Sequence, residues 1–483
     1  MLSKKKITAF YILSLLFVAA NGLIVYLTES YLFSAIPLVF LFLLFSLFAL
    51  DKMLILSFAL VPLSVPLKEF LPGLDFDMAL PTEPLLFLIL LIFILKQIRD
   101  RDFDKNILKH PVSKVLYFYL GWIAITTITS SMPLVSLKYL MVKLWFIIPF
   151  YFLLTQVFKN KPNIYKSFWF YIVPFIIVII YTLVRHAPHY FDQKSSNFVM
   201  TPFFNDHTSY GALLAMYIPI IAGMVLDKTG RKITRIISLG VLGLFVVAIV
   251  FSYTRASWVG LIAAMGLFVL LKLKVKIRTL FIGAGIVGTL FILYQGQIMM
   301  NLEQNKQDSS TNLQEHVKSI SNVATDASNL ERINRWNCAI RMFQEKPLFG
   351  FGPGTYQFKY APYQFSYEKT IISTNAGDMG NAHSEYLGPL SESGIFGMLS
   401  MLAIVIVFYL TSIRLYYKLK DPKTKTLIVS IICGMTTYFI HGLMNNFLDT
   451  DKASAPFWAF FAIVVAIDVY HQEKSPEKAG ELL

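Results

Sequence analysis

Long apolar runs separated by short polar loops dominate the sequence. Each run is continuous rather than alternating and about 18–22 residues long, which is typical of a helix that crosses a bilayer. Because the bilayer core offers backbone groups no hydrogen-bond partner, such runs must satisfy their own amides and carbonyls as helices. About 14 such runs occur, near residues 7–27, 31–50, 53–70, 80–97, 112–131, 137–157, 163–184, 209–226, 234–252, 256–272, 277–297, 394–416, 426–446 and 454–471.

The pattern therefore predicts an all-α polytopic membrane protein with about 12–14 transmembrane helices. Four prolines, Pro62, Pro66, Pro72 and Pro81, interrupt the third and fourth runs, so one of these two is expected to bend or to re-enter the membrane.

Basic residues occupy alternate loops. They cluster in residues 4–6, 96–109, 159–166, 228–235, 272–278 and 414–425, all on the side of the N-terminus. Lysine and arginine are enriched in cytoplasmic loops, so both termini are predicted to be cytoplasmic.

One polar stretch, 298–393, interrupts the spans on the opposite, periplasmic side. It divides the chain into about 11 spans over residues 1–297, a periplasmic catalytic loop over 298–393, about three spans over 394–472 and a cytoplasmic tail over 473–483. A long folded loop on one side of a membrane protein suggests that the loop acts on a substrate.

A helix is predicted inside this loop. Ser328 and Glu331 have the spacing of a capping box, and the helix that they begin is expected to run to about Gln344. Its apolar positions form a stripe at helical spacing that can pack on the membrane domain or lie in the interface: Ile333, Trp336, Ile340 and Phe343.

Composition supports the membrane assignment. The chain of 483 residues is 56% hydrophobic with a mean hydropathy of +0.59. Its net charge of +14 follows membrane topology and does not indicate nucleic acid. Cys338 and Cys433 fall in different predicted environments, which argues against a disulfide and a thiolate metal cluster.

Four arginines are candidates for binding an anion. Arg255 lies between two spans on the outer side, where it either holds phosphate or anchors the helix at the interface beside Tyr253 and Trp258. Arg332, Arg335 and Arg341 lie on the loop helix, and each either binds phosphate or belongs to a solvated face. Arg332 is at the helix start, where the helix N-terminus favours an anion.

His383 is the candidate general base, because imidazole accepts a proton from a sugar hydroxyl near neutral pH. The alternative is a structural loop histidine, and the rival histidines are His207, His316 and His441. Glu385 and Glu392 can orient the histidine or replace it. The glycines at 350–354 lack the Lys-Ser/Thr of a nucleotide loop, and no ligand pattern indicates a metal or cofactor.

Four segments together resemble the O-antigen ligase and polymerase superfamily of bacterial envelope glycosyltransferases. They are PFFNDH at 202–207, SYTRAS at 252–257, RINRW at 332–336 followed by PLFGFG at 347–352, and NAHSEYL at 381–387 followed by ESGIFG at 392–397. The resemblance covers residue 202 to the last span, and the earlier spans match only in kind.

The resemblance implies a GT-C-like membrane fold at the bacterial inner membrane with a periplasmic active site. It implies an inverting, metal-independent transfer of glycan from undecaprenyl diphosphate, with no cofactor. Arg255 and Arg332 would hold the diphosphate, with Arg335 added from its place on the same helix side, and His383 would activate the acceptor hydroxyl, assisted by Glu385. His207, Arg341 and Glu392 are secondary candidates.

Several acceptors fit this donor. A ligase would transfer the glycan to lipid A-core, a polymerase would extend another carrier-linked glycan, and a protein O-oligosaccharyltransferase would modify a protein hydroxyl. A transporter of the lipid-linked glycan is an alternative of another class. It would place charged residues inside the spans, whereas the candidate groups lie mainly outside them.

Overall fold

The computed structural model describes residues 4–29, 32–37, 48–71, 77–275, 278–279, 282–283, 285–286, 289, 327–369, 373 and 380–472. These residues form helices almost throughout, and the one described sheet is a pair of two-residue strands, β1 (Val65–Pro66) and β2 (Ala79–Leu80). Nine of the described helical segments are long and apolar enough to cross a membrane. The prediction of an all-α polytopic membrane protein is therefore confirmed.

The longer helices are α1 (Lys4–Thr28), α3 (Leu50–Leu60), α4 (Thr82–Asp100), α6 (Pro111–Ile128), α7 (Pro133–Ile147), α9 (Lys161–His186), α10 (His207–Leu226), α11 (Lys232–Phe251), α12 (Arg255–Lys272), α15 (Ala327–Glu345), α17 (Leu387–Lys418), α18 (Pro422–His441) and α19 (Asp451–Tyr470). The short helices are α5 (Lys105–Lys109), α8 (Leu154–Val157) and α16 (Tyr356–Lys359). Single turns lie at η1 (Leu32–Ala35), η2 (Val61–Leu63), η3 (Leu67–Glu69), η5 (Ala187–His189), η6 (Ser195–Asn197), η7 (Ala361–Tyr363) and η8 (Ser366–Glu368), and the π-helical η4 (Ile148–Leu153) joins α7 to α8.

The third predicted span is wrong in its second half. Residues 53–70 were expected to form one helix, but α3 ends at Leu60 and the chain continues through the turn η2 into β1. Pro62 and Pro66 explain the break, because a proline inside a helix removes a hydrogen bond and clashes with the preceding turn. The predicted spans 31–50 and 277–297 lie mostly outside the described residues.

A glycine divides α17. The span predicted to begin at residue 394 is continuous with a preceding helical segment from Leu387, and Gly394 between them has φ of 68°. The periplasmic loop of the prediction thus runs directly into its membrane helix through a kink at this glycine.

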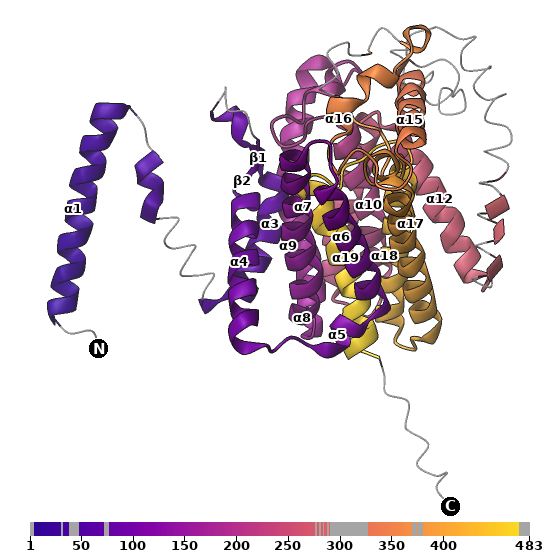
Figure 1. Ribbon diagram of the computed structural model, residues 1–483. Coiled ribbons are helices and arrows are strands. Elements are labelled where there is room, and N and C mark those ends of the chain that lie inside the picture. Colours follow the sequence, from indigo (N-terminus) through magenta and orange to yellow (C-terminus); the bar gives the residue numbers. More distant parts are fainter. Residues whose placement is uncertain are drawn as a thin grey trace, which may run out of the picture.

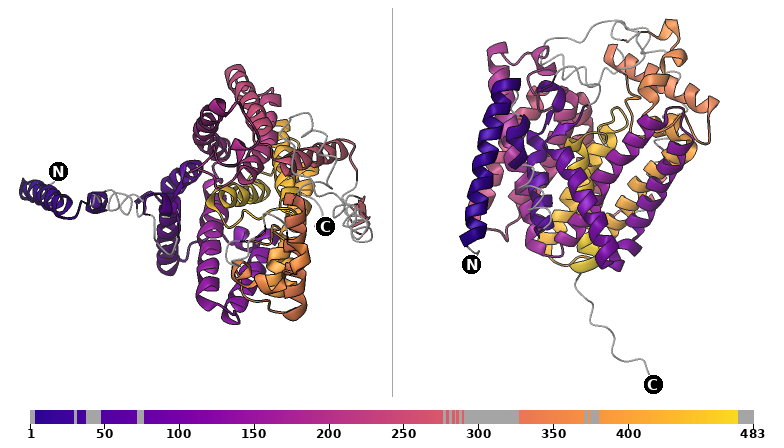
Figure 2. Two further views of the ribbon diagram at one scale, coloured as in Figure 1. Left: turned by 90° about the horizontal axis from the view of Figure 1, so that it is seen from above. Right: turned by 60° about the vertical axis from the view of Figure 1, so that its left-hand side comes forward.

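α19 lies in the middle of the bundle, as the view from above shows (Figure 2). Every residue of α19 from Asp451 to Ile467 is buried. Its sequence is apolar on all sides and includes five small alanines, which let neighbouring helices approach closely. α10 and α18 pack against it and against each other.

Different elements cover the two ends of the bundle. α15 and α16 lie together at one end, and α5 lies at the other, near the C-terminal end of α19 (Figure 1). Basic side chains make ion pairs at the α5 end, where Lys161 Nζ lies 3.2 Å from Asp421 Oδ2. α1 stands apart from the bundle in this view.

Candidate active site

α15 packs mainly through a face that the apolar stripe did not predict. The helix itself is confirmed, but its buried residues are Glu331, Asn334, Arg335, Cys338, Ala339 and Met342. Of the predicted stripe, Ile340 is 39% exposed. Cys338, Ala339 and Met342 instead form a small core with residues from 351–382. The buried polar residues of the helix lie in its first half, on the same face as this core. The side chain of Ser328 lies outside the described residues.

Arg335 is the most confined of the candidate arginines. Its Nε lies 2.7 Å from Glu331 Oε1, and its guanidinium stacks over the Tyr360 ring at 3.9 Å. Burial opposes the charge, but Tyr360 and Glu331 together raise the pKa of Arg335. The guanidinium also packs closely on the backbone at Gly380, where a Cβ would overlap it. Arg335 therefore remains charged inside the loop.

His383 lies beside these arginines. Its backbone has φ of 46°, and its N–H donates to Asn381 Oδ1 at 2.9 Å. Trp336 on α15 donates its indole N–H to the His383 carbonyl at 3.3 Å, which ties the histidine segment to the helix. Burial, together with the charges of Arg332 and Arg335, lowers the pKa of His383 to about 4, and Asp206 opposes this shift. The imidazole is thus neutral near pH 7 and able to accept a proton.

The start of α10 completes this cluster. Asp206 caps the helix by accepting from Ser209 N–H at 2.7 Å, and His207 is its first residue. His441, at the end of α18, lies within electrostatic reach of Arg332, Asp206 and His207. The sequence suggested His207 and His441 as rivals of His383, and the structure brings all three into one neighbourhood. His316 lies outside the described residues.

Arg255 approaches the cluster through α12. It is the first residue of that helix and is half-buried. The preceding Thr254 donates its hydroxyl to the His207 carbonyl at 2.8 Å, which holds the starts of α10 and α12 together. Gly211 allows this contact, because a Cβ there would overlap the Thr254 side chain.

Glu385 is buried in a hydrogen-bond network of its own. Its Oε1 accepts from Tyr438 Oη at 2.7 Å, Phe447 N at 2.7 Å and Leu448 N at 2.9 Å. Burial raises the pKa of Glu385 and Asp449 adds to this effect, whereas Lys143 and these donors oppose it. The geometry gives Glu385 the task of holding the 441–448 segment against the His383 loop.

Glu392 has a similar holding contact. Its Oε1 accepts from Tyr356 N at 2.9 Å, and its backbone carbonyl accepts from Gly352 N at 2.8 Å. Gly350 has φ of 66°, and a Cβ there would overlap the Glu392 backbone. The glycine segment at 350–354 is therefore a close-approach turn against α17.

Arg341 lies in a separate part of the loop. Its Nη1 lies 2.6 Å from Glu368 Oε2 and 2.8 Å from the Tyr363 carbonyl, and the guanidinium stacks on Phe365 at 3.8 Å. These contacts fold residues 361–368 onto α15.

A cavity of about 490 Å³ lies next to the His383 loop. Asn381, Ala382, Ser384, Glu385 and Glu392 form part of its wall. A smaller cavity of about 220 Å³ adjoins it and shares six charged or polar neighbours and one aromatic: Asp77, Glu83, Asn205, Asp206, Asp449, Thr450 and Phe447. Within the described part of the chain, no group of three or more His, Cys, Asp or Glu side chains is arranged to hold a metal ion.

Fold and site together define a polytopic membrane protein with a cluster of arginines and histidines, beside a cavity, at one end of its helix bundle. Residues 240–402 match the family model described as O-antigen ligase, which supports the O-antigen ligase and polymerase superfamily that the four motifs predicted. The match begins within α11, includes Arg255, Arg332 and His383, and ends within α17. No curated protein matches the chain.

Proposed function

We propose that the protein transfers a glycan from undecaprenyl diphosphate to an acceptor hydroxyl at the outer face of the bacterial inner membrane. The observation that carries this proposal is the meeting of Arg332, Arg335 and His383 at one end of a membrane bundle, inside the segment that matches O-antigen ligases. Cations suit the diphosphate, and a neutral imidazole suits the hydroxyl.

The arginines serve the leaving group. Negative charge grows on the diphosphate as its bond to the anomeric carbon breaks, and guanidinium groups placed beforehand stabilise that charge most in a site with little water. Arg332 and Arg255 take the diphosphate oxygens. Arg335, held by Glu331 and Tyr360, supplies a fixed positive charge behind them.

His383 serves the acceptor. It removes the proton from the hydroxyl as the acceptor oxygen bonds to the anomeric carbon, and undecaprenyl diphosphate departs from the opposite face, so the configuration inverts. The proton leaves His383 for solvent after transfer. Asp206, whose charge acts on His383, stabilises the imidazolium that forms. The arginines neutralise the leaving group, so the proposed transfer needs no metal.

Glu385 acts as a positioning residue in this proposal. Its three accepted hydrogen bonds fix residues 438–448 beside the His383 loop. Because the Glu385 carboxylate already accepts these three hydrogen bonds, it is better suited to fixing the position of the His383 loop than to accepting a proton from the substrate.

Transport is the second candidate and finds less support. Buried charges do occur near the cavity, for Lys143 is 2% exposed and Lys452 is 7% exposed. However, Lys143 binds the Leu448 carbonyl and Asp449, and Lys452 binds the carbonyls of Val61 and Ser64. Both lysines are thus held by partners within the protein, as structural ion pairs are. A transport pathway would instead expose such charges to the substrate.

The test is a transfer assay in nanodiscs with an undecaprenyl-diphosphate glycan and EDTA present. The assay is carried out in parallel with three acceptors: lipid A-core, a second carrier-linked glycan and a serine-containing peptide. We expect transfer to lipid A-core. Elongated carrier-linked glycan would identify a polymerase, and modified peptide a protein transferase. Movement of the donor across liposomes without transfer to any acceptor would contradict the proposal.

A further inference from the structure

The two joined cavities beside His383 have no role in the chemistry described so far. We propose that they form the subsite for the acceptor glycan and that they select a neutral, hydroxyl-rich sugar over an anionic one. This inference rests on the proposed transfer reaction and extends it to the substrate class. The larger cavity, at about 490 Å³, lies within the range of about 300–1,000 Å³ that small-molecule sites occupy.

The position of the cavities fits an acceptor. Ala382 and Ser384, on either side of His383, both line the larger one. Asp206, whose charge acts on His383, lines both. A sugar in this space would therefore lie next to the segment that carries the proposed base.

The wall offers the groups that bind sugars. Tyr119, Tyr139 and Phe447 supply aromatic surface for the apolar face of a sugar ring, and Glu83 and Asp449 supply acceptors for its hydroxyls. Asn446 also lines the cavity, and its buried Oδ1 has no hydrogen-bond partner in the part of the chain that the structure describes. A buried acceptor of this kind is costly unless a ligand donates to it.

The charges of the cavity wall favour the acceptor glycan over the diphosphate of the donor. Three aspartates of the wall, Asp77, Asp206 and Asp449, outnumber its two lysines, and the buried Lys143 already binds Asp449 Oδ1 at 2.7 Å. A diphosphate would therefore meet repulsion here, whereas the arginines of α15 beside His383 attract it. Uronic acids or phosphorylated sugars would meet the same repulsion.

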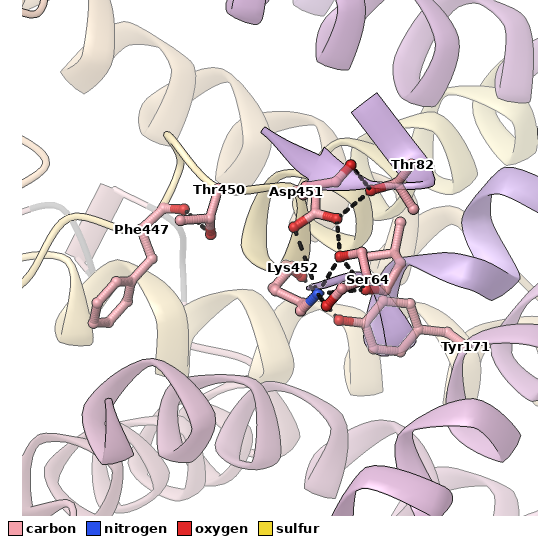
Figure 3. A network of polar contacts seen from close by, with 9 residues as sticks. Ser64, Thr82, Tyr171, Phe447, Thr450, Asp451 and Lys452 are labelled. Carbon is pink, nitrogen blue, oxygen red and sulfur yellow. Dashed lines mark hydrogen bonds and ion pairs between the residues drawn. The ribbon is translucent and has the colours of Figure 1, made fainter. Parts of the chain in front are cut away.

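A buried network fixes the wall, as Figure 3 shows. Asp451 accepts from the hydroxyls of Ser64 and Thr82 at 2.5 Å each, and Lys452 donates to the carbonyls of Val61 and Ser64. These bonds join the start of α19 to the turn after α3 and the start of α4. Thr450 closes the loop onto the Phe447 carbonyl at 2.8 Å. The cavity is thus built before any ligand enters, which lowers the cost of binding.

The test measures glycan binding without turnover. Full-length protein in nanodiscs is titrated with a neutral trisaccharide and with its uronate counterpart, and saturation-transfer NMR reports binding. The variants are Glu83→Gln and Asn446→Ala. Asp227→Asn, at the other end of the bundle beside Lys423, is the matched control. We expect the neutral glycan to bind the wild type and the control equally, the uronate to bind neither, and both cavity variants to bind about tenfold more weakly.

Kinetics assign the site to the acceptor. With the transfer assay, the two cavity variants should raise the KM for acceptor about tenfold and leave the KM for donor within about twofold. A rise in the donor KM instead, or unchanged glycan binding in both variants while thermal unfolding is normal, would overturn the inference. A wild type that binds the neutral glycan yet transfers nothing would reject the proposed function and leave the sugar site standing.

Discussion

At the scale of single residues, His383 is the group on which the proposed chemistry depends. The sequence predicts that His383, Arg255 and Arg332 lie on outward loops, because short motifs and the order of the spans carry that information. The sequence did not show that Asp206 acts on His383, or that the Trp336 indole binds the carbonyl of His383. These partners come from separate parts of the chain, and only folding brings them together.

The first prediction concerns pH. The pKa of His383 is about 4 instead of 6.5, so the base stays neutral as pH falls from 6.5 toward 4 and is lost only below that value. The acid limb of kcat/KM should therefore lie near pH 4. Arg332→Gln removes a charge that lowers this pKa, so the acid limb of the kcat/KM profile should move to higher pH even if the variant transfers glycan more slowly. A limb near 6.5 in the wild type, or a shift to lower pH in the variant, would contradict the assignment.

Glu385 separates positioning from proton transfer. Glu385→Ala leaves the Tyr438 hydroxyl and the Phe447 and Leu448 amides without their acceptor, at a cost of about 1–3 kcal/mol each, so the unfolding temperature should fall strongly. Glu385→Gln keeps a carbonyl acceptor and should keep most of the stability and activity. A Gln variant that unfolds like wild type yet is as inactive as His383→Ala would make Glu385 a catalytic carboxylate.

At the scale of elements, sequence patterns located most of the helices but not their faces. A long apolar run in a bilayer forms a spanning helix, because its backbone groups must bond to one another. The helices from residue 111 to 272 therefore lie close to their predicted positions. The α15 stripe failed because its polar residues have partners: Arg335 pairs with Glu331 on the same helix, and Asn334 donates to the Glu368 carbonyl of the loop. Such pairing favours burial of a polar face, which hydrophobic periodicity alone cannot indicate.

The kink of α17 yields the third prediction. Gly394 has φ of 68°, and a Cβ there would overlap the Leu348 carbonyl, so Gly394→Ala should strain the backbone and displace the 347–352 turn. We expect a lower unfolding temperature and reduced transfer. Gly266→Ala in α12 is the matched control, because a Cβ at that site meets nothing within 4 Å. Equal stability of the two variants would show that the kink is not required.

At the scale of the whole molecule, the sequence predicts a topology but not the buried polar contacts of the core. Alternating basic loops predict which end is cytoplasmic. The buried lysines in the helices were not predicted, because their partners lie up to 391 residues away, as Val61 does from Lys452.

Cysteine labelling tests this topology. Ser366 and Lys228 are exposed at opposite ends of the bundle, and the native Cys338 and Cys433 are buried. A membrane-impermeant maleimide added to intact cells should label Ser366→Cys, and should label Lys228→Cys only after the cells are broken open. The reverse pattern would place the candidate site on the cytoplasmic side.

The most direct test of the central claim compares undecaprenyl-diphosphate release by wild type, His383→Ala and His189→Ala in the transfer assay. His189 is exposed on the short turn after α9, so its variant controls for the loss of an imidazole. We predict that His383→Ala lowers acceptor-dependent release by about 10²–10⁴-fold and that His189→Ala does not change it. Unchanged release by a folded His383→Ala protein would contradict the account.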